Sequence, residues 1–425
     1  MQTFSVPVKP LWKTDVLVVG GGCAGVVAAI AAAMQGVSVA LVERYGFLGG
    51  ISTQVLDTFC GFYSRDDQKI VGGIPDRVIE ALAQHGEILY RPSSYSEAGQ
   101  VISYNPATLK VVWEMLAHQA GVNSLLHTLV VDVLTEDDRV TGIVAVNKGG
   151  FITISAQVVV DASGDADVAA AAGVPFESAE RGPLQAMTTT FKLINVDVDQ
   201  ASLVSKDQLH RLMVEAAETG PYDVTPQGNV TLTPMTGVMS ANMTRLTKLD
   251  PVDPRQLSQA ERVGRSQAME YFRFMRDKVP GYENAELIDF STQIGIRESR
   301  RIVGAYRLTR DDILSGREFD DAIAKGAWPI EDHRPDGTTV QALARTYEIP
   351  YRCLLPRKVE GLLIAGRCLS ADHAAHASVR VMAQCMAMGQ AAGLAAAITS
   401  RRSVLLRRLS IEKLKDRLRK IGAVI

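Results

Sequence analysis

The feature that most constrains this chain is a cluster of glycines between two apolar runs near the N-terminus. An apolar run over residues 15–19 leads into Gly20-Gly21-Gly22-Cys23-Ala24-Gly25. A small-residue stretch over 26–35 and a second apolar run over 37–43 follow. This order predicts a strand, a Gly-x-Gly-x-x-Gly loop, a helix and a parallel strand, the context in which such a loop binds a dinucleotide. The sequence therefore predicts an α/β fold with a nucleotide-binding parallel sheet.

The residue types in this loop fit the contacts that a bound dinucleotide needs. Gly20 permits the tight turn, Gly22 lets the backbone approach a pyrophosphate, and Gly25 permits close packing of helix on sheet. The amides at the helix start attract the phosphate charge. Glu43, at the end of the second run, is expected to bind a ribose diol. We interpret Cys23 as a buried neutral thiol rather than a nucleophile.

A second glycine-rich loop follows Glu43 and ends in Gly49-Gly50. A chain that binds NAD more usually continues into another helix at this point. The extra loop offers more backbone donors beyond the pyrophosphate, as a longer cofactor requires. The second loop therefore favours FAD over NAD.

Two later glycine clusters repeat the pattern of a strand followed by a turn and a helix. Residues 121–161 predict a three-stranded β-meander and then a buried strand over 158–161, which runs into a polar turn over 162–167. Near the C-terminus, a strand over 361–366 precedes a polar loop over 368–380 and a small-residue helix over 381–399. Gly389 and Gly393 lie inside that helix, where each costs about 1 kcal/mol relative to Ala. They predict that another part of the molecule approaches the backbone of this helix closely.

Composition excludes several classes of function. The chain has 425 residues, with 45 Lys+Arg against 47 Asp+Glu, so a formal charge of −2 argues against nucleic acid or an anionic membrane as partner. No run of about 20 apolar residues predicts a membrane span, and no signal peptide is recognised at the start. Its five cysteines form no CxxC pair, which argues against disulfides and a zinc site. We expect a cytoplasmic protein of two or three domains without a metal.

Together the clusters resemble the FAD-dependent oxidoreductases of the glutathione-reductase-like flavoprotein superfamily, in the branch related to fumarate reductase and succinate dehydrogenase flavoproteins. The matching segments are 20–50, 158–177, 293–313, 349–356 and 362–393. The resemblance implies noncovalent FAD and a Rossmann-like FAD-binding domain, a parallel sheet plus β-meander, with an inserted α+β substrate or cap domain. The expected ranges are 1–60, 105–180 and 350–398 for the FAD domain, 61–104 and 181–345 for the cap, and 399–425 for a C-terminal helix docked on the FAD domain.

The resemblance also implies which residues contact FAD. The contacts to the phosphates, the ribose and the start of the flavin fall on Gly20, Gly22, Cys23, Ala24, Gly25, Glu43, Arg44, Gly49, Gly50, Ile51 and Ser52. The adenine, the second contact loop, the ribityl chain and the pyrimidine end fall on Val130, Ala162, Gly164, Asp165, Gly366, Arg367 and Gly389. In this chain Arg367 stands where related flavoproteins often carry an acid, and Cys23 stands where they have Pro or Ser.

Histidines in the polar loop are candidates for proton transfer. In relatives this loop faces the flavin, and imidazole titrates near neutral pH, so His373 and His376 are candidate proton donors or acceptors. The alternative is that they only pack the loop. His333 is a weaker candidate.

Arginines are candidates for binding negative charge. Arg297 or Arg301 is expected either to bind a substrate carboxylate or to belong to a solvated ion-pair cluster. Arg380 is expected to stabilise negative charge on the flavin or the substrate.

The function expected from these residues is hydride transfer between the flavin N5 and a small polar organic substrate, as a desaturation, its reverse, or an alcohol or amine oxidation. One alternative is an FAD-binding electron-transfer subunit of a larger complex, and a second is a flavin monooxygenase. The electron acceptor or donor stays open, and so does a homo-oligomer.

Overall fold

The computed structural model describes residues 5–86, 88–178, 184–402 and 404–425, and a seven-stranded sheet forms its centre. The strand order is β6-β2-β1-β9-β8-β7, and β20 also pairs with β9. Five strands are parallel: β1 (Val8–Val19), β2 (Val39–Val42), β6 (Asn123–Leu125), β9 (Gly150–Asp161) and β20 (Leu362–Ile364). The antiparallel strands β7 (Leu129–Glu136) and β8 (Arg139–Asn147) complete the sheet. The predicted Rossmann-like sheet with a meander is confirmed.

Strand β9 joins the meander to the parallel sheet. Its first half pairs with β8 and its second half pairs with β20, for example Val160 with Leu363. The expectation of a third meander strand followed by a separate buried strand is wrong. Both halves pair with β1, as in the pairs Lys13–Ser155 and Val18–Val160. This shared partner keeps β9 one continuous strand.

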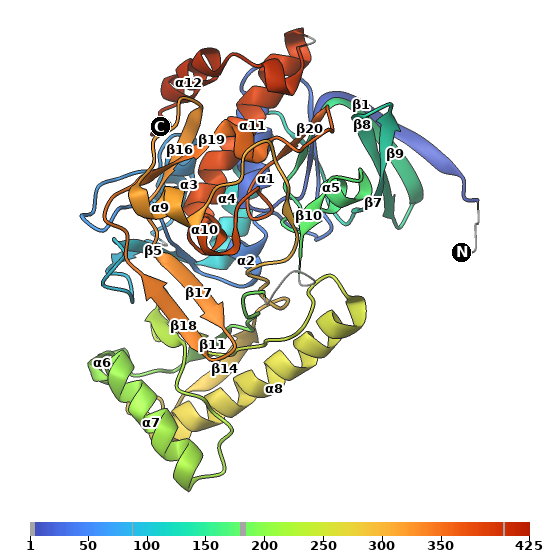
Figure 1. Ribbon diagram of the computed structural model, residues 1–425. Helices are drawn as coiled ribbons and strands as arrows, with labels where there is room; N and C mark the ends of the chain where they lie inside the picture. Colours follow the sequence, from blue (N-terminus) through green and yellow to red (C-terminus); the bar gives the residue numbers. More distant parts are fainter. Residues whose placement is uncertain (1–4, 87, 179–183, 403) are drawn as a thin grey trace.

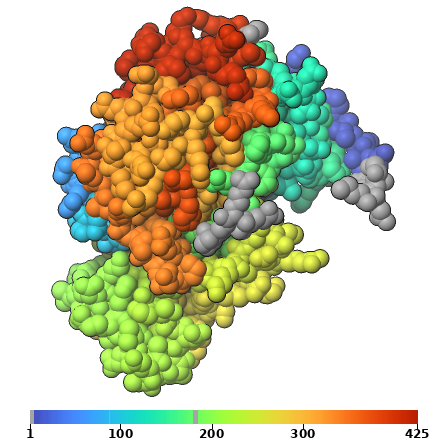
Figure 2. All heavy atoms as spheres, in the orientation of Figure 1, coloured from blue at the N-terminus to red at the C-terminus, as the bar shows by residue number. Residues whose placement is uncertain are grey.

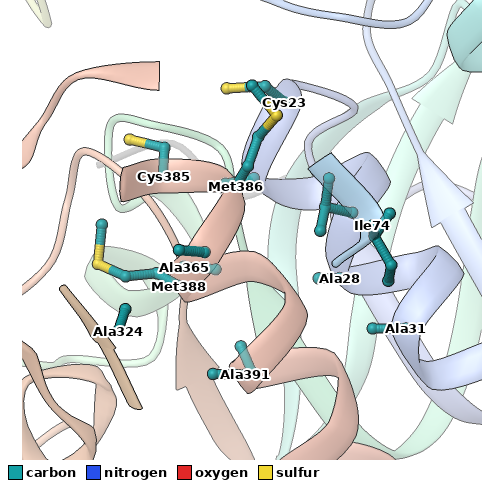
Figure 3. Packing of buried hydrophobic residues seen from close by; sticks show 14 of the residues in the cluster. Cys23, Ala28, Ala31, Ile74, Ala324, Ala365, Cys385, Met386, Met388 and Ala391 are labelled. Carbon is teal, nitrogen blue, oxygen red and sulfur yellow. The ribbon is translucent and has the colours of Figure 1, made fainter. Parts of the chain in front are cut away.

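Two small-residue helices pack face to face on this sheet. They are α1 (Cys23–Ala33) and α11 (Met382–Arg402), and Figure 3 shows Ala28 and Ala31 of α1 near Met386 and Ala391 of α11. A Cβ on Gly389 would lie 2.2 Å from the Ala24 carbonyl oxygen, and one on Gly393 would lie 2.0 Å from that of Ala28. The close approach that these interior glycines predict is therefore between the backbones of two helices.

A second sheet forms a lobe, which projects below the rest of the molecule in Figures 1 and 2. We call the part built around the seven-stranded sheet the main body. Its order is β12-β13-β11-β14, and the strands are β11 (Phe191–Ile194), β12 (Asn229–Leu232), β13 (Met239–Asn242) and β14 (Glu286–Phe290). The lobe's helices are α6 (Val198–Leu203), α7 (Lys206–Thr219) and α8 (Pro254–Lys278). Helix α8 begins at Pro254, where Asp253 caps it by accepting from the Arg255 and Gln256 amides. The lobe has its own core, which includes Phe191 and Phe274.

Parts of the expected cap domain pack on the main body instead. Within 61–104 they are α3 (Ile74–Gln84), β4 (Ile88–Arg91) and β5 (Val101–Tyr104), which pairs with β3 (Thr58–Phe59). Within 181–345 they are α9 (Arg310–Ser315) and β16 (Ala322–Gly326), which pairs with β19 (Tyr347–Pro350) just beyond that range. Val78 and Ile323 belong to the same hydrophobic cluster as α1 and α11, so shared core packing overrides the expected boundary. The expected boundary at 180/181 lies outside the described residues.

The other elements cover the edges of the main body. They are α2 (Ile51–Gln54), α4 (Pro106–Gln119), α5 (Asp167–Ala171), β10 (Phe176–Glu177), β15 (Arg301–Ile302), β17 (Ile330–Arg334), β18 (Gly337–Gln341), α10 (His373–Val379) and α12 (Ile411–Lys420). Two 3-10 turns span Tyr351–Leu354 and Leu406–Arg408. Helix α12 packs on the main body through the buried Leu414 and Leu418. Within the described ranges no single helix meets the length and hydropathy needed to span a membrane, and only α10 with α11, bent by 90°, passes as a pair.

Candidate functional site

A cavity of about 950 Å³ lies between the main body and the lobe. Its wall on the side of the main body comes from the loops that follow the carboxyl ends of β1, β2, β9 and β20. In open α/β sheets this is the edge at which ligands bind. The opposite wall comes from the lobe and from the hairpin of β17 and β18.

The start of α1 supplies a phosphate-sized opening in this wall. Helical hydrogen bonding begins with the Val26 amide on the Gly22 carbonyl oxygen at 2.9 Å, and no side chain in the described part of the chain caps the helix. A Cβ on Gly22 would find only the Gly50 Cα, at 4.0 Å, so this position faces open space. Gly20 has φ +98°, and a Cβ there would lie 2.4 Å from the Ala162 carbonyl oxygen. The glycines therefore keep the backbone close around an uncapped helix start.

The second glycine-rich loop packs against the first. The Gly49 amide donates to the Gly21 carbonyl oxygen at 2.7 Å. A Cβ on Gly50, whose φ is +55°, would lie 2.8 Å from the Gly22 Cα. Ser52 is fully buried and its hydroxyl donates to the Gly49 carbonyl oxygen at 2.7 Å. The second loop thus shapes the cradle by supporting the first loop from behind.

Glu43 is a buried carboxylate in the cavity wall. It is 6% exposed, and its two oxygens accept from the Gly21 amide at 2.6 Å and from the Tyr45 amide at 2.9 Å. Burial raises the pKa of Glu43 above its ordinary value, and the amide donors oppose that change. The carboxylate is therefore held in one orientation at the edge of the cradle.

Asp165 and Arg367 form a buried ion pair beside Gly366. An Nη of Arg367 lies 2.8 Å from Asp165 Oδ1, which also accepts from the Ser299 hydroxyl at 2.6 Å. Burial alone would raise the pKa of Asp165, but the Arg367 guanidinium and these hydrogen bonds hold it below its ordinary value. The acid that relatives carry at position 367 is thus replaced by an arginine that binds an acid from the neighbouring loop.

The structure brings most of the expected FAD contacts into one wall. The lining includes Gly20, Gly22, Cys23, Ala24, Glu43, Arg44, Ile51, Ala162, Gly164, Asp165, Gly366 and Arg367. Six expected contacts do not line the cavity: Gly25, Gly49, Gly50, Ser52, Val130 and Gly389. Val130 lies on β7 and packs against the core on the other side of the sheet, and Gly389 packs on α1. The direct contacts expected of these two residues stay predictions without support from the cavity lining.

These features fit bound FAD. The uncapped start of α1 suits the pyrophosphate of FAD, and the oriented Glu43 carboxylate suits its ribose. The Asp165–Arg367 pair supplies a polar wall for the rest of the cofactor. The cavity continues from this wall toward the lobe, where a substrate would meet the cofactor.

The expected roles of His373 and His376 are not supported by their positions, because neither lines the cavity. The segment that carries them is the helix α10, capped by Asp372, rather than a loop. His376 is fully buried, Nε2 donates to the Arg367 carbonyl oxygen at 2.9 Å, and burial lowers its pKa to about 3. His373 bridges Glu298 at 2.9 Å and Asp332 at 3.1 Å. The His376 imidazole is uncharged at neutral pH and packs inside the fold, whereas the His373 imidazole forms ion pairs.

Arg297 and Arg380 do line the cavity. Arg297 Nη1 donates to the Ala186 carbonyl oxygen at 2.6 Å, and Arg380 Nη2 donates to Gln185 Oε1 at 3.0 Å. The Nε of Arg380 is buried and has no acceptor in the described residues, and neither guanidinium lies within 4.0 Å of a carboxylate described there. Burial lowers the pKa of Arg297 to about 10, so it stays charged at neutral pH. Among the described residues, the cavity therefore contains two cations with no carboxylate within 4.0 Å, and Glu331 attracts both from farther away.

The sequence did not identify Glu331 as a site residue. Glu331 lines the cavity and accepts from Tyr95 Oη at 2.8 Å, from Trp328 Nε1 at 2.9 Å and from His333 Nε2 at 2.9 Å. Burial raises its pKa, but His333 and the other donors more than offset this and leave it below the ordinary value. Its place two residues before His333, which also lines the cavity, is too weak a signal to identify it from the sequence.

Comparison with known proteins gives a family match and a curated relative. The family model described as FAD dependent oxidoreductase matches residues 15–418. Digeranylgeranylglycerophospholipid reductase of Methanoculleus marisnigri is 27% identical over 227 residues, 51% of this chain and 54% of that protein, so the match spans about half the length of this curated relative.

Two solved structures have a similar arrangement. A geranylgeranyl bacteriochlorophyll reductase-like protein from Thermoplasma acidophilum has a TM-score of 0.49 and 13% identity, covering 96% of this chain and 84% of its own. Glycine oxidase from Geobacillus kaustophilus has a TM-score of 0.46 and 15% identity, covering 92% of this chain and 95% of its own.

Proposed function

Because the chain belongs to the FAD dependent oxidoreductase family, we propose that it transfers a hydride between bound FAD and a small polar organic substrate that carries a carboxylate. When bound, FAD supplies the two-electron chemistry, and the chain supplies binding and orientation. The observation that carries the proposal is the pair Arg297 and Arg380, which face the cavity without a carboxylate partner in the described residues.

A buried cation is costly unless an anion compensates its charge. Arg297 donates to the Ala186 carbonyl oxygen and, at 3.4 Å, to Asn242 Oδ1, and Arg380 donates to Gln185 Oε1. Each guanidinium has five N–H donors, so several stay free for a ligand. A carboxylate accepts such donors in a bidentate arrangement, which fixes the orientation of the molecule that bears it. Substrate binding would therefore remove an unfavourable charge and align the substrate at the same time.

The lining of the lobe supports a polar substrate. It contributes hydroxyl and amide side chains such as Thr190, Ser240, Asn242 and Gln267. The name of the archaeal relative indicates a phospholipid substrate for that protein. We propose a small polar substrate here instead, because this polar lining matches a polar molecule better than a long apolar chain.

The linkage of FAD, the location of the protein and two alternative functions complete the proposal. We propose that FAD is bound noncovalently, because neither His85 nor His127 lines the cavity. We also propose a cytoplasmic protein, because its cysteines form no pair typical of disulfide frameworks. An electron-transfer subunit would not need unpaired arginines in a cavity, and a monooxygenase would need a source of reducing equivalents such as NAD(P)H.

Anaerobic mixing of the FAD-loaded protein with a panel of 2-hydroxy acids, 2-amino acids and dicarboxylates tests the proposal. We expect loss of flavin absorbance with a member of the panel and none with its carboxamide analogue. Arg297→Met should raise the half-saturating concentration about 30-fold or more, the effect of losing a charge pair worth about 2 kcal/mol. Equal reduction by the carboxamide, or no reduction by any acid, would contradict the proposal.

A further inference from the structure

Asp57 is a buried carboxyl in the cavity wall that has no role in the arrangement described so far. It is 4% exposed, follows α2 in the chain and lines the cavity. Its Oδ2 is buried and has no hydrogen-bond partner in the described residues, and Oδ1 receives a 3.4 Å contact from the Thr58 hydroxyl. The Ser240 hydroxyl also lies close enough to lower the pKa of this carboxyl. An unsatisfied buried carboxyl oxygen is unfavourable for folding, so its presence at a cavity calls for a functional explanation.

The backbone around Asp57 holds the side chain at the junction of the main body and the lobe. The Thr190 hydroxyl of the lobe donates to the Val55 carbonyl oxygen, and the Thr292 amide donates to the Gln54 carbonyl oxygen at 2.9 Å. On the other side, the Tyr104 amide donates to the Asp57 carbonyl oxygen at 2.9 Å. The backbone that carries the Asp57 carboxyl is therefore held by both parts of the molecule.

Four groups from neighbouring elements face this carboxyl. The two cations among them, Arg91 and Lys192, have other side chains as their partners. Arg91 of β4 donates to Ser103 Oγ at 2.9 Å and to Thr58 Oγ1 at 3.2 Å, and Lys192 of β11 lies 3.9 Å from Asp289. Tyr104 of β5 donates to the Ser52 carbonyl oxygen, and Ser240 of β13 lies beside Asp57. Asp57 therefore has no ion-pair partner within 4.0 Å among the described residues.

This environment affects proton binding. Burial raises the pKa of Asp57 above its ordinary value, and Lys192, Ser240 and Arg91 only partly offset that effect. A carboxyl of raised pKa in a cleft is suited to exchange protons near neutral pH. The histidines expected to do so, His373 and His376, lie outside the cavity lining.

We propose that Asp57 exchanges the proton with the substrate in the hydride transfer proposed above, on which this inference rests. In the oxidising direction the substrate C–H bond breaks and its electron pair leaves with the hydrogen, as a hydride, to FAD. The O–H or N–H bond on the adjacent atom breaks as well, its proton passes to Asp57 Oδ2, and its electron pair forms the new C=O or C=N bond. In the reducing direction Asp57 returns this proton as the hydride leaves reduced FAD.

Asp57→Asn tests the role, because the amide keeps the shape of the side chain and cannot take the proton. We expect retained FAD, an unchanged or higher melting temperature, and flavin reduction by the active panel member that is at least about 100-fold slower, without the pH-dependent limb of the wild-type rate. Asp66→Asn, at an exposed position nearby, makes the same charge change and should leave the rate unchanged. A rate for Asp57→Asn within twofold of wild type would overturn the inference.

Carboxyl NMR of FAD-loaded protein labelled with 13C in its aspartates needs no substrate. We expect one resonance to vanish in Asp57→Asn and to titrate, in wild type, above the range of ordinary aspartates near 4. If no panel member reduces the flavin, the proposed function fails, and this titration still decides the inference. A resonance that titrates in the ordinary range would overturn it.

Discussion

Arg297 and Glu298 are neighbours in the chain, yet their charges serve different parts of the molecule. Arg297 lines the cavity, whereas the Glu298 side chain is fully buried and binds Arg301 Nε at 2.9 Å and His373 Nδ1 at 2.9 Å. Burial would raise the pKa of Glu298, but the two histidines and Arg301 more than offset it and bring it to about 2. At the residue scale, Glu298 stabilises the fold through its charged partners, and Arg297 keeps donors available to a ligand.

The ion pairs of His373 predict a pH dependence of stability. Asp332 and then Glu298 raise its pKa to about 9, against about 6.5 in the unfolded chain. Because the folded pKa is the higher one, this contribution to stability is complete below pH 6.5 and is lost as pH rises through 9. His373→Gln should therefore lower the urea midpoint at pH 6, and the difference from wild type should shrink above pH 9.

His118→Gln is the control for this experiment, because His118 is exposed on α4. It should leave the urea midpoint unchanged at both pH values. A deficit of His373→Gln that stays constant from pH 6 to above pH 9 would contradict the assignment of these ion pairs.

At the scale of elements, the contact of α1 with α11 predicts the sign of a glycine substitution. In an isolated helix Gly→Ala is favourable by about 1 kcal/mol. Here the added Cβ at Gly389 would lie 2.2 Å from the Ala24 carbonyl oxygen, a backbone atom that cannot move without shifting α1. Gly389→Ala should therefore destabilise the protein by about 1–3 kcal/mol, measured by chemical denaturation.

Val111→Ala is a suitable comparison, because Val111 is 61% exposed on α4 and its truncation removes no core contact. Its free energy of unfolding should stay within about 0.5 kcal/mol of wild type. Stabilisation by Gly389→Ala would show that the two helices are not in contact at this point.

The sequence predicts elements well where the signal is local. The loop between β1 and α1, and the Asp253 cap of α8, are encoded within a few residues. Helix α10 was missed because its polar residues were interpreted as a loop, although Asp372 before an alanine-rich stretch is a helix-start signal. Asp57 and Glu331 could not be found from spacing, because only tertiary packing brings their distant segments to one cavity.

At the scale of the whole molecule, the main body and the lobe contribute different walls of the cavity. The main body provides the uncapped start of α1, Glu43 and the Asp165–Arg367 pair, all from loops at one edge of the sheet. The lobe provides the polar opposite wall, and Arg297 and Arg380 lie in the cavity between them. A near-neutral net charge is consistent with recognition by this local pair of cations rather than by the overall charge.

The crystal structure of the FAD-loaded protein soaked with oxalate tests this arrangement most directly, because oxalate has two carboxylates and no hydrogen to transfer. We predict the FAD pyrophosphate at the amides that follow Gly22, and an oxalate carboxylate on the guanidinium groups of Arg297 and Arg380. A pyrophosphate bound away from the start of α1, or an oxalate that contacts neither arginine, would contradict the account.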